Sequence, residues 1–120
     1  MDTVRLLEKL AKEYPEKRAI IFKEQVITFA QLKDLTFKLA DALLKSGIKK
    51  QDKVGIYLPS HPEYIYSYLA IWSIGATAVP LDFMLTEDEL VSCLSHAEAK
   101  ALLYKHKTNV SQVNLKKNIP

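Results

Sequence analysis

Three histidines are the side chains of this sequence best suited to acid–base or metal chemistry: His61, His96 and His106. None of them has a second histidine, a cysteine or a carboxylate at a spacing typical of a metal site. His61 lies between a predicted strand and a predicted helix, the position at which α/β sheets often bind ligands. We therefore treat His61 as the strongest candidate of the three, although helix capping or a surface position is the commoner role for such a histidine.

One aspartate, a run of three acidic residues and one cysteine complete the set of candidate groups. Asp82 directly follows another predicted strand and could belong to a site, but a turn or cap role is favoured. The run Glu87–Glu89 lies at the start of a predicted helix, where carboxylates complement the helix dipole without any metal. Cys93 is the only cysteine, which excludes an intramolecular disulfide. It could act as a nucleophile, but its apolar helical surroundings favour a small buried side chain.

The glycines argue against a phosphate-binding loop. Gly47, Gly55 and Gly75 are the only three and each stands alone, so neither GxGxxG nor a P-loop sequence occurs. Four tyrosines could line an apolar ligand pocket, but core or interface packing is their commoner use: Tyr57, Tyr64, Tyr66 and Tyr68. The sequence therefore assigns no catalytic, cofactor-binding or metal-binding residue.

The elements that carry these groups include a strand–helix–strand unit. Short apolar runs at Val54–Leu58 and Thr77–Leu81 flank an apolar segment of helical length, Pro62–Ile74. Two parallel strands need such a crossover, so the pattern predicts a βαβ unit. The middle helix is apolar on nearly every side but too short for a bilayer, which requires about 20 apolar residues. We therefore expect both of its faces to be covered.

The rest of the chain continues the alternation of helices and strands. In chain order we predict an amphipathic helix (Asp2–Tyr14), a hairpin (Ala19–Phe22 and Val26–Phe29), a helix capped at Gly47, the βαβ unit, a helix (Glu87–Ala97) and a strand (Ala101–Tyr104). This order is typical of an α/β fold with a mostly parallel sheet and flanking helices, here with an N-terminal β-hairpin. We predict one α/β domain over residues 1–104 and a polar, loosely ordered tail over residues 105–120.

Finer predictions come from spacing within the helices. Three Ser/Thr-x-x-Glu/Gln pairs predict capping boxes, with either Ser60 or His61 as the cap of the middle helix. The pairs are Thr28 with Gln31, Ser60 with Glu63, and Thr86 with Glu89. Apolar periodicity predicts two buried stripes: Leu32, Leu35, Leu39, Ala42 and Leu43 in the helix before Gly47, and Leu90, Val91 and Leu94 in the last helix.

Bulk composition is that of an ordinary globular protein, with 48% hydrophobic and 26% charged residues. The net charge of +3 and the short lysine groups could indicate a nucleic-acid or membrane patch. The lysines are neither continuous nor interleaved with aromatic residues, so solvated loops are favoured and no nucleic-acid partner is expected. No signal-peptide core follows Asp2 and Arg5, and no segment is long enough to span a bilayer. We therefore expect a cytoplasmic protein.

Several stretches together resemble the N-terminal part of the adenylate-forming (AMP-binding) enzymes. They are YPEKRAIIF, ITFAQL and LLKSGIKKQDKVGIYLPSHPEYIYSYLAIWSIGATAVPLDFMLTEDEL, in unbroken order between Lys12 and Tyr104. The family comprises acyl- and aryl-CoA synthetases, luciferases and the adenylation domains of peptide synthetases. The ending VPLDFMLTEDEL is most similar to fatty-acyl-CoA ligases. The resemblance implies a partial N-terminal subdomain of the adenylate-forming fold.

The same resemblance implies a reaction for the complete enzyme. A carboxylate attacks the α-phosphate of Mg-ATP to give an acyl-adenylate and pyrophosphate, and the thiol of coenzyme A then displaces AMP. The family's phosphate loop, its adenine and ribose motifs and its catalytic lysine lie downstream of the matched region and are not among these 120 residues. ITFAQL and WSIGATAVPLD serve the family mainly in folding and packing, so no catalytic residue is carried over.

Two interpretations of function follow. The first is an N-terminal fragment of an acyl-CoA synthetase that is inactive alone and binds no cofactor itself, with ATP, Mg and CoA expected for the complete enzyme. The alternative is a non-catalytic α/β interaction module that self-associates or pairs with a second chain, because an edge strand and apolar surface would be left open. An autonomous Rossmann-like cofactor domain is disfavoured by the isolated glycines.

Overall fold

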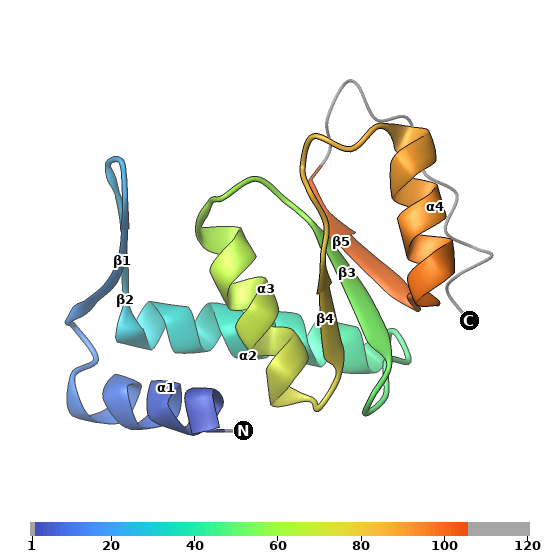
Figure 1. The fold of residues 1–120 in the computed structure, drawn as a ribbon. Coiled ribbons are helices and arrows are strands. Elements are labelled where there is room, and N and C mark those ends of the chain that lie inside the picture. Colours follow the sequence, from blue (N-terminus) through green and yellow to red (C-terminus); the bar gives the residue numbers. More distant parts are fainter. Residues whose placement is uncertain (1, 106–120) are drawn as a thin grey trace.

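The computed structural model describes residues 2–105, which form four helices and five strands (Figure 1). In chain order these are α1 (Asp2–Glu13), β1 (Arg18–Phe22), β2 (Gln25–Thr28), α2 (Phe29–Lys45), β3 (Lys53–Tyr57), α3 (Pro62–Ser73), β4 (Thr77–Pro80), α4 (Glu87–Ala97) and β5 (Ala101–Tyr104). The predicted α/β class with a parallel sheet and an N-terminal hairpin is confirmed. Apart from Lys105, the tail predicted at 105–120 lies outside the described residues.

Strand β3 is the centre of a three-stranded parallel sheet with the order β4-β3-β5. Strands β1 and β2 pair antiparallel as a separate hairpin, with Ile21 opposite Val26 and Ile20 opposite Ile27. The predicted crossover from β3 through α3 to β4 is confirmed. A second crossover through α4 brings β5 to the other side of β3.

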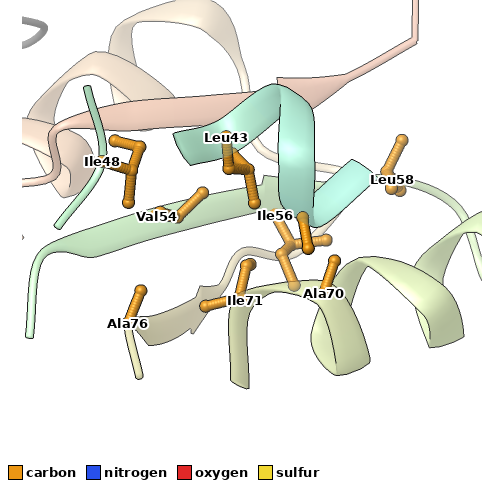
Figure 2. Packing of buried hydrophobic residues seen from close by; sticks show 9 residues of the cluster. Leu43, Ile48, Val54, Ile56, Leu58, Ala70, Ile71 and Ala76 are labelled. Carbon is orange, nitrogen blue, oxygen red and sulfur yellow. The ribbon is translucent and has the colours of Figure 1, made fainter. Parts of the chain in front are cut away.

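Different helices pack on the two faces of the sheet. Successive side chains of a strand point to opposite faces, so each face has its own set of core residues. Val54 and Ile56 of β3 pack with Leu43 of α2 and with Ala70 and Ile71 of α3 (Figure 2). On the opposite face, α4 packs over the sheet through a cluster comprising Tyr57, Leu81, Leu90, Leu94, Ala99 and Leu102. The result is a sheet with α2 and α3 on one side and α4 on the other.

A third cluster joins the N-terminal elements to α3. It contains Leu7 of α1, Ile27 of β2, Leu32 of α2 and Leu69 of α3. Helix α3, predicted to need cover on both faces, therefore has the sheet and α2 against one side and the α1–hairpin region against another. Its remaining side is open in the described part of the chain, where Ile65 is 43% exposed.

The buried stripe of α2 differs from the prediction. Leu32 and Leu43 are buried as predicted, Leu35 and Leu39 are half-buried and pack against the core clusters, and Ala42 is exposed. Thr36 and Ala40, which were not predicted, complete the buried row. This row connects two clusters that both contain residues of α3, so the direction from which α3 packs decides which side of α2 is buried. The small side chains of Thr36 and Ala40 suit a close approach of the two helices.

Helix α4 also buries fewer residues than predicted. Leu90 and Leu94 are buried as expected, but Val91 is exposed, and so is Cys93, which the sequence placed among buried side chains. Leu90 and Leu94 lie one above the other on the side that faces the sheet. Val91 and Cys93 fall outside that row.

Candidate functional site

The candidate site is the carboxyl edge of the three-stranded sheet, where β3 leads into α3 and β4 leads into α4. These two neighbouring strands send their crossovers to opposite faces, which is the topology at which α/β sheets bind ligands. The sequence candidates His61 and Asp82 both lie at this edge, in the loops that follow β3 and β4.

Tyr57 ends β3 and supports the loop between β4 and α4. Its side chain is 1% exposed, and its hydroxyl donates a hydrogen bond to the carbonyl oxygen of Leu85 at 2.7 Å. Its ring also contacts that of Phe83, with centroids 5.2 Å apart. Tyr57 therefore takes the packing role favoured for it.

Asp82 shapes the same loop. Its Oδ1 accepts a hydrogen bond from the backbone N–H of Met84 at 2.9 Å, and its carbonyl oxygen accepts one from the N–H of Leu85 at 3.1 Å. This is the turn role favoured from the sequence. The carboxylate of Asp82 is thus engaged with the backbone that leads to α4.

The start of α4 is closed by the predicted capping box. The Thr86 N–H donates to Glu89 Oε1 at 2.9 Å, and the Glu89 N–H donates to Thr86 Oγ1 at 3.3 Å. The hydrogen bond from the Thr86 backbone is the main cause that lowers the pKa of Glu89, while the nearby charge of Asp82 opposes this effect. The acidic run lies in the first turn of α4, as predicted, where the helix dipole favours it.

His61 is the N-cap residue of α3, but its imidazole makes no capping hydrogen bond. Instead its ring packs against Phe22 of the hairpin, with centroids 4.7 Å apart. The predicted capping box between Ser60 and Glu63 is wrong. Glu63 forms an ion pair with Lys105 at the end of β5, so its carboxylate is directed across the sheet edge and away from the N-terminal turn.

Three of the tyrosine candidates lie along α3. The rings of Tyr64 and Tyr68 have centroids 5.3 Å apart, and the ring of Tyr68 lies 5.2 Å from that of Trp72. Burial, and secondly a hydrogen bond with Tyr64, raises the pKa of Tyr68 to about 12. Burial also raises the pKa of Tyr66. The raised pKa values keep Tyr66 and Tyr68 protonated at neutral pH, and all three tyrosine side chains serve in packing.

The other candidates are not brought to this edge. His96 lies in the last turn of α4, ten residues beyond the Thr86 cap and therefore about 15 Å along the helix. Cys93 is exposed on the same helix, and His106 lies outside the described residues. Within residues 2–105 no group of three or more His, Cys, Asp or Glu side chains is placed to hold a metal ion. Among the helices of this region, none combines the length and hydropathy that a membrane crossing requires.

Sequence reasoning missed two residues at this edge, Lys105 and Phe22. Lys105 had a usable signal, because it directly follows β5 and so reaches the edge where β3 and β4 end. Phe22 had none, since its contact with His61 depends on how the hairpin folds against α3. With both included, the carboxylates at the edge bind the backbone or Lys105, and the Tyr57 hydroxyl binds the backbone. The arrangement stabilises the loops and offers no nucleophile–base pair among the described residues.

Solved structures show which class of protein has this fold. Over 91% of the chain it matches the N-terminal subdomain of NpsA from Klebsiella oxytoca, in complex with anthranilyl-AMSN, with a TM-score of 0.79 and 28% identity. The match covers 28% of that chain. The fold is therefore that of part of the N-terminal subdomain of the adenylate-forming enzymes.

Sequence comparisons give the family. Residues 7–120 match the model of the AMP-binding enzyme family, so the chain belongs to it. A medium/long-chain-fatty-acid–CoA/3-oxocholest-4-en-26-oate–CoA ligase of Mycobacterium tuberculosis is 31% identical over 102 residues, which is 85% of this chain. Oxalate–CoA ligase of Arabidopsis thaliana is 35% identical over 106 residues, or 87% of this chain. The chain spans 19% and 21% of the length of these two relatives.

Proposed function

We propose that this chain is the N-terminal structural part of an acyl-CoA synthetase that activates a carboxylic acid with ATP and transfers the acyl group to coenzyme A. The observation that carries the proposal is the family match over residues 7–120, together with similarity to CoA ligases of different organisms. Fatty acids are the proposed substrate class, supported by the similarity to a fatty-acid–CoA ligase. A cytoplasmic location is part of the proposal, and cell fractionation tests it.

The chemistry itself is proposed to belong to other residues of the enzyme. ATP bound with Mg²⁺ supplies the adenylate, and coenzyme A supplies the thiol that accepts the acyl group. The residues at the sheet edge do not fit these groups, because Asp82, Glu89 and Glu63 are each engaged in a turn, a cap or an ion pair. No glycine-rich loop is present to surround a phosphate. In this proposal the chain holds a sheet edge on which the reactive parts of the enzyme assemble.

An activity assay tests the role assigned to the chain. The purified 120 residues are incubated with ATP, Mg²⁺, CoA and a series of fatty acids, with a complete acyl-CoA ligase as the positive control. We expect no pyrophosphate release above the level without protein. Release that depends on both ATP and the fatty acid would show that the chain contains a catalytic site and would overturn the proposal. The intact mass of the protein made from its natural gene then decides whether the chain works within a longer polypeptide.

A second candidate function is a non-catalytic interaction module that self-associates or pairs with a second chain. The observation that favours it is the outer face of the hairpin, where the directly opposite side chains of Ile21 and Val26 are 64% and 43% exposed. An isolated two-stranded sheet is marginally stable, so a partner on this face would support it. Size-exclusion chromatography with light scattering at tens of micromolar tests self-association. A monomer at every concentration would leave pairing with a second chain as the only form of this function.

A further inference from the structure

The groove between α1 and α2 is a second surface, separate from the sheet edge. It has a volume of about 600 Å³ and is lined by Glu8, Lys9, Ala11, Lys12, Ala30, Lys33, Asp34 and Phe37. Helix α1 contributes positions 8, 9, 11 and 12, and α2 contributes positions 30, 33, 34 and 37. Residues three and four apart share a helix face, so the groove runs between two helical ridges.

The floor of the groove is apolar and its rim is basic. Ala11 is buried, Ala30 and Phe37 are half-buried, and the lysines Lys9, Lys12 and Lys33 are exposed. Small side chains on the floor leave room for an anchoring side chain of a ligand, and Phe37 gives it an apolar contact.

The charges of the groove are not balanced within the described part of the chain. Asp34 is neutralised by Lys38 at 3.0 Å, whereas Lys9, Lys12 and Lys33 have no ion pair among residues 2–105. With Glu8 as the one remaining carboxylate, the groove keeps an excess of two positive charges.

We propose that this groove binds an acidic amphipathic helix of a partner protein. An apolar floor between two helices accepts the apolar face of a third helix, and the lysine rim is complementary to carboxylates flanking that face. The stretch from Ala30 to Phe37 is about 10 Å long, which corresponds to two turns of a bound helix. A single-stranded nucleic acid fits less well, because Phe37 is the only ring in the lining on which a base could stack.

A fluorescein-labelled 14-residue helical peptide with a leucine face flanked by glutamates is the probe. We expect the protein to bind it with micromolar affinity at 150 mM salt, and to bind a version with glutamine in place of every glutamate at least tenfold more weakly. Affinity falls as salt rises because the interaction is between exposed charges. Absence of binding at 500 µM protein, or equal affinity for the glutamine version, would overturn the proposal.

Charge-reversal variants locate the binding surface. The double variant Lys12→Glu/Lys33→Glu is expected to weaken peptide binding at least tenfold. The matched control Lys49→Glu/Lys100→Glu has the same net charge at exposed lysines outside the groove and is expected to change affinity less than twofold. All four positions are exposed, and thermal melts by circular dichroism confirm that both variants fold. Equal weakening by both pairs, or tighter binding of a single-stranded DNA of equal label and charge, would contradict the proposal.

Discussion

The hydroxyl of Tyr57 donates to the carbonyl oxygen of Leu85 at 2.7 Å, joining two residues that are 28 positions apart. The hydrogen bond fastens the end of the central strand to the loop that starts α4. Because Tyr57 is almost fully buried and Leu85 packs against the same cluster, both partners lie at the base of the carboxyl edge of the sheet.

Replacing Tyr57 with phenylalanine tests this link. Tyr57→Phe keeps the packing of the ring but leaves the Leu85 carbonyl without this donor, so we expect a loss of about 1 kcal/mol in the free energy of unfolding. Urea denaturation followed by circular dichroism measures it. Tyr66→Phe is the control, since Tyr66 is half-buried and its hydroxyl has no hydrogen bond in the described part of the chain. Equal effects of the two substitutions would contradict a specific role for the Tyr57 hydroxyl.

Replacing Thr36 is expected to have the opposite effect on stability from replacing Tyr57. Its hydroxyl oxygen is fully buried and has no hydrogen-bond partner among the described residues. Thr36→Val removes the hydroxyl with almost no change of shape, so we expect the protein to be stabilised by about 1 kcal/mol. Thr28→Val is the contrasting variant, because the Thr28 hydroxyl caps α2 and its loss costs about 1 kcal/mol. A destabilising Thr36→Val would show that the buried hydroxyl has a partner.

Local features of this fold could be predicted from the sequence because they depend on residues close together in the chain. The capping boxes at Thr28 and Thr86, the left-handed position of Gly47 and the bounds of β5 are of this kind. The buried sides of α2 and α4 were predicted less well. Ala42 and Val91 fit an apolar stripe, but the direction of the neighbouring layer decides which row is covered.

The candidate site likewise contains some contacts that local spacing predicts and others that it does not. Asp82 and Glu89 act within five residues of their own positions, and their turn and cap roles followed from spacing. Contacts of His61 with Phe22 and of Glu63 with Lys105 join residues 39 and 42 positions apart. Nothing in the local spacing indicates such pairs, and they replaced the capping box expected at Ser60.

Glu98 occupies the left-handed position after a helix, which is usually held by glycine. It has φ 58 after α4, its N–H donates to the Ser95 carbonyl at 3.1 Å, and the next N–H, of Ala99, donates to the Leu94 carbonyl at 3.0 Å. The same pair of bonds follows α2, where Gly47 takes the left-handed position with φ 97. Since a Cβ strains this conformation, we expect Glu98→Gly to stabilise the protein by about 0.5–1 kcal/mol.

Two variants control this prediction in thermal melts. Glu98→Ala removes the charge but keeps the Cβ, so it is expected to gain less than Glu98→Gly. Gly47→Ala introduces the same strain after α2 and is expected to destabilise by about 1 kcal/mol. Equal melting temperatures for Glu98→Ala and Glu98→Gly would show that charge, and not backbone strain, limits stability at this position.

The raised pKa of Tyr68 predicts that the protein loses stability at alkaline pH. Burial, together with the hydrogen bond to Tyr64, raises its pKa from 10.0 to about 12 in the folded protein. Below pH 10 the phenol is neutral in both states and its contribution to stability is fully present. Between pH 10 and 12 the unfolded chain ionises first, so the unfolded state is favoured and the contribution is lost as pH rises.

Melting temperatures between pH 8 and 12 should therefore fall less steeply for Tyr68→Phe than for the natural sequence, whereas Tyr14→Phe, at a half-exposed tyrosine, should leave the profile unchanged. If Tyr68→Phe and the natural sequence gave parallel profiles, the phenol of Tyr68 would not be the group that limits alkaline stability.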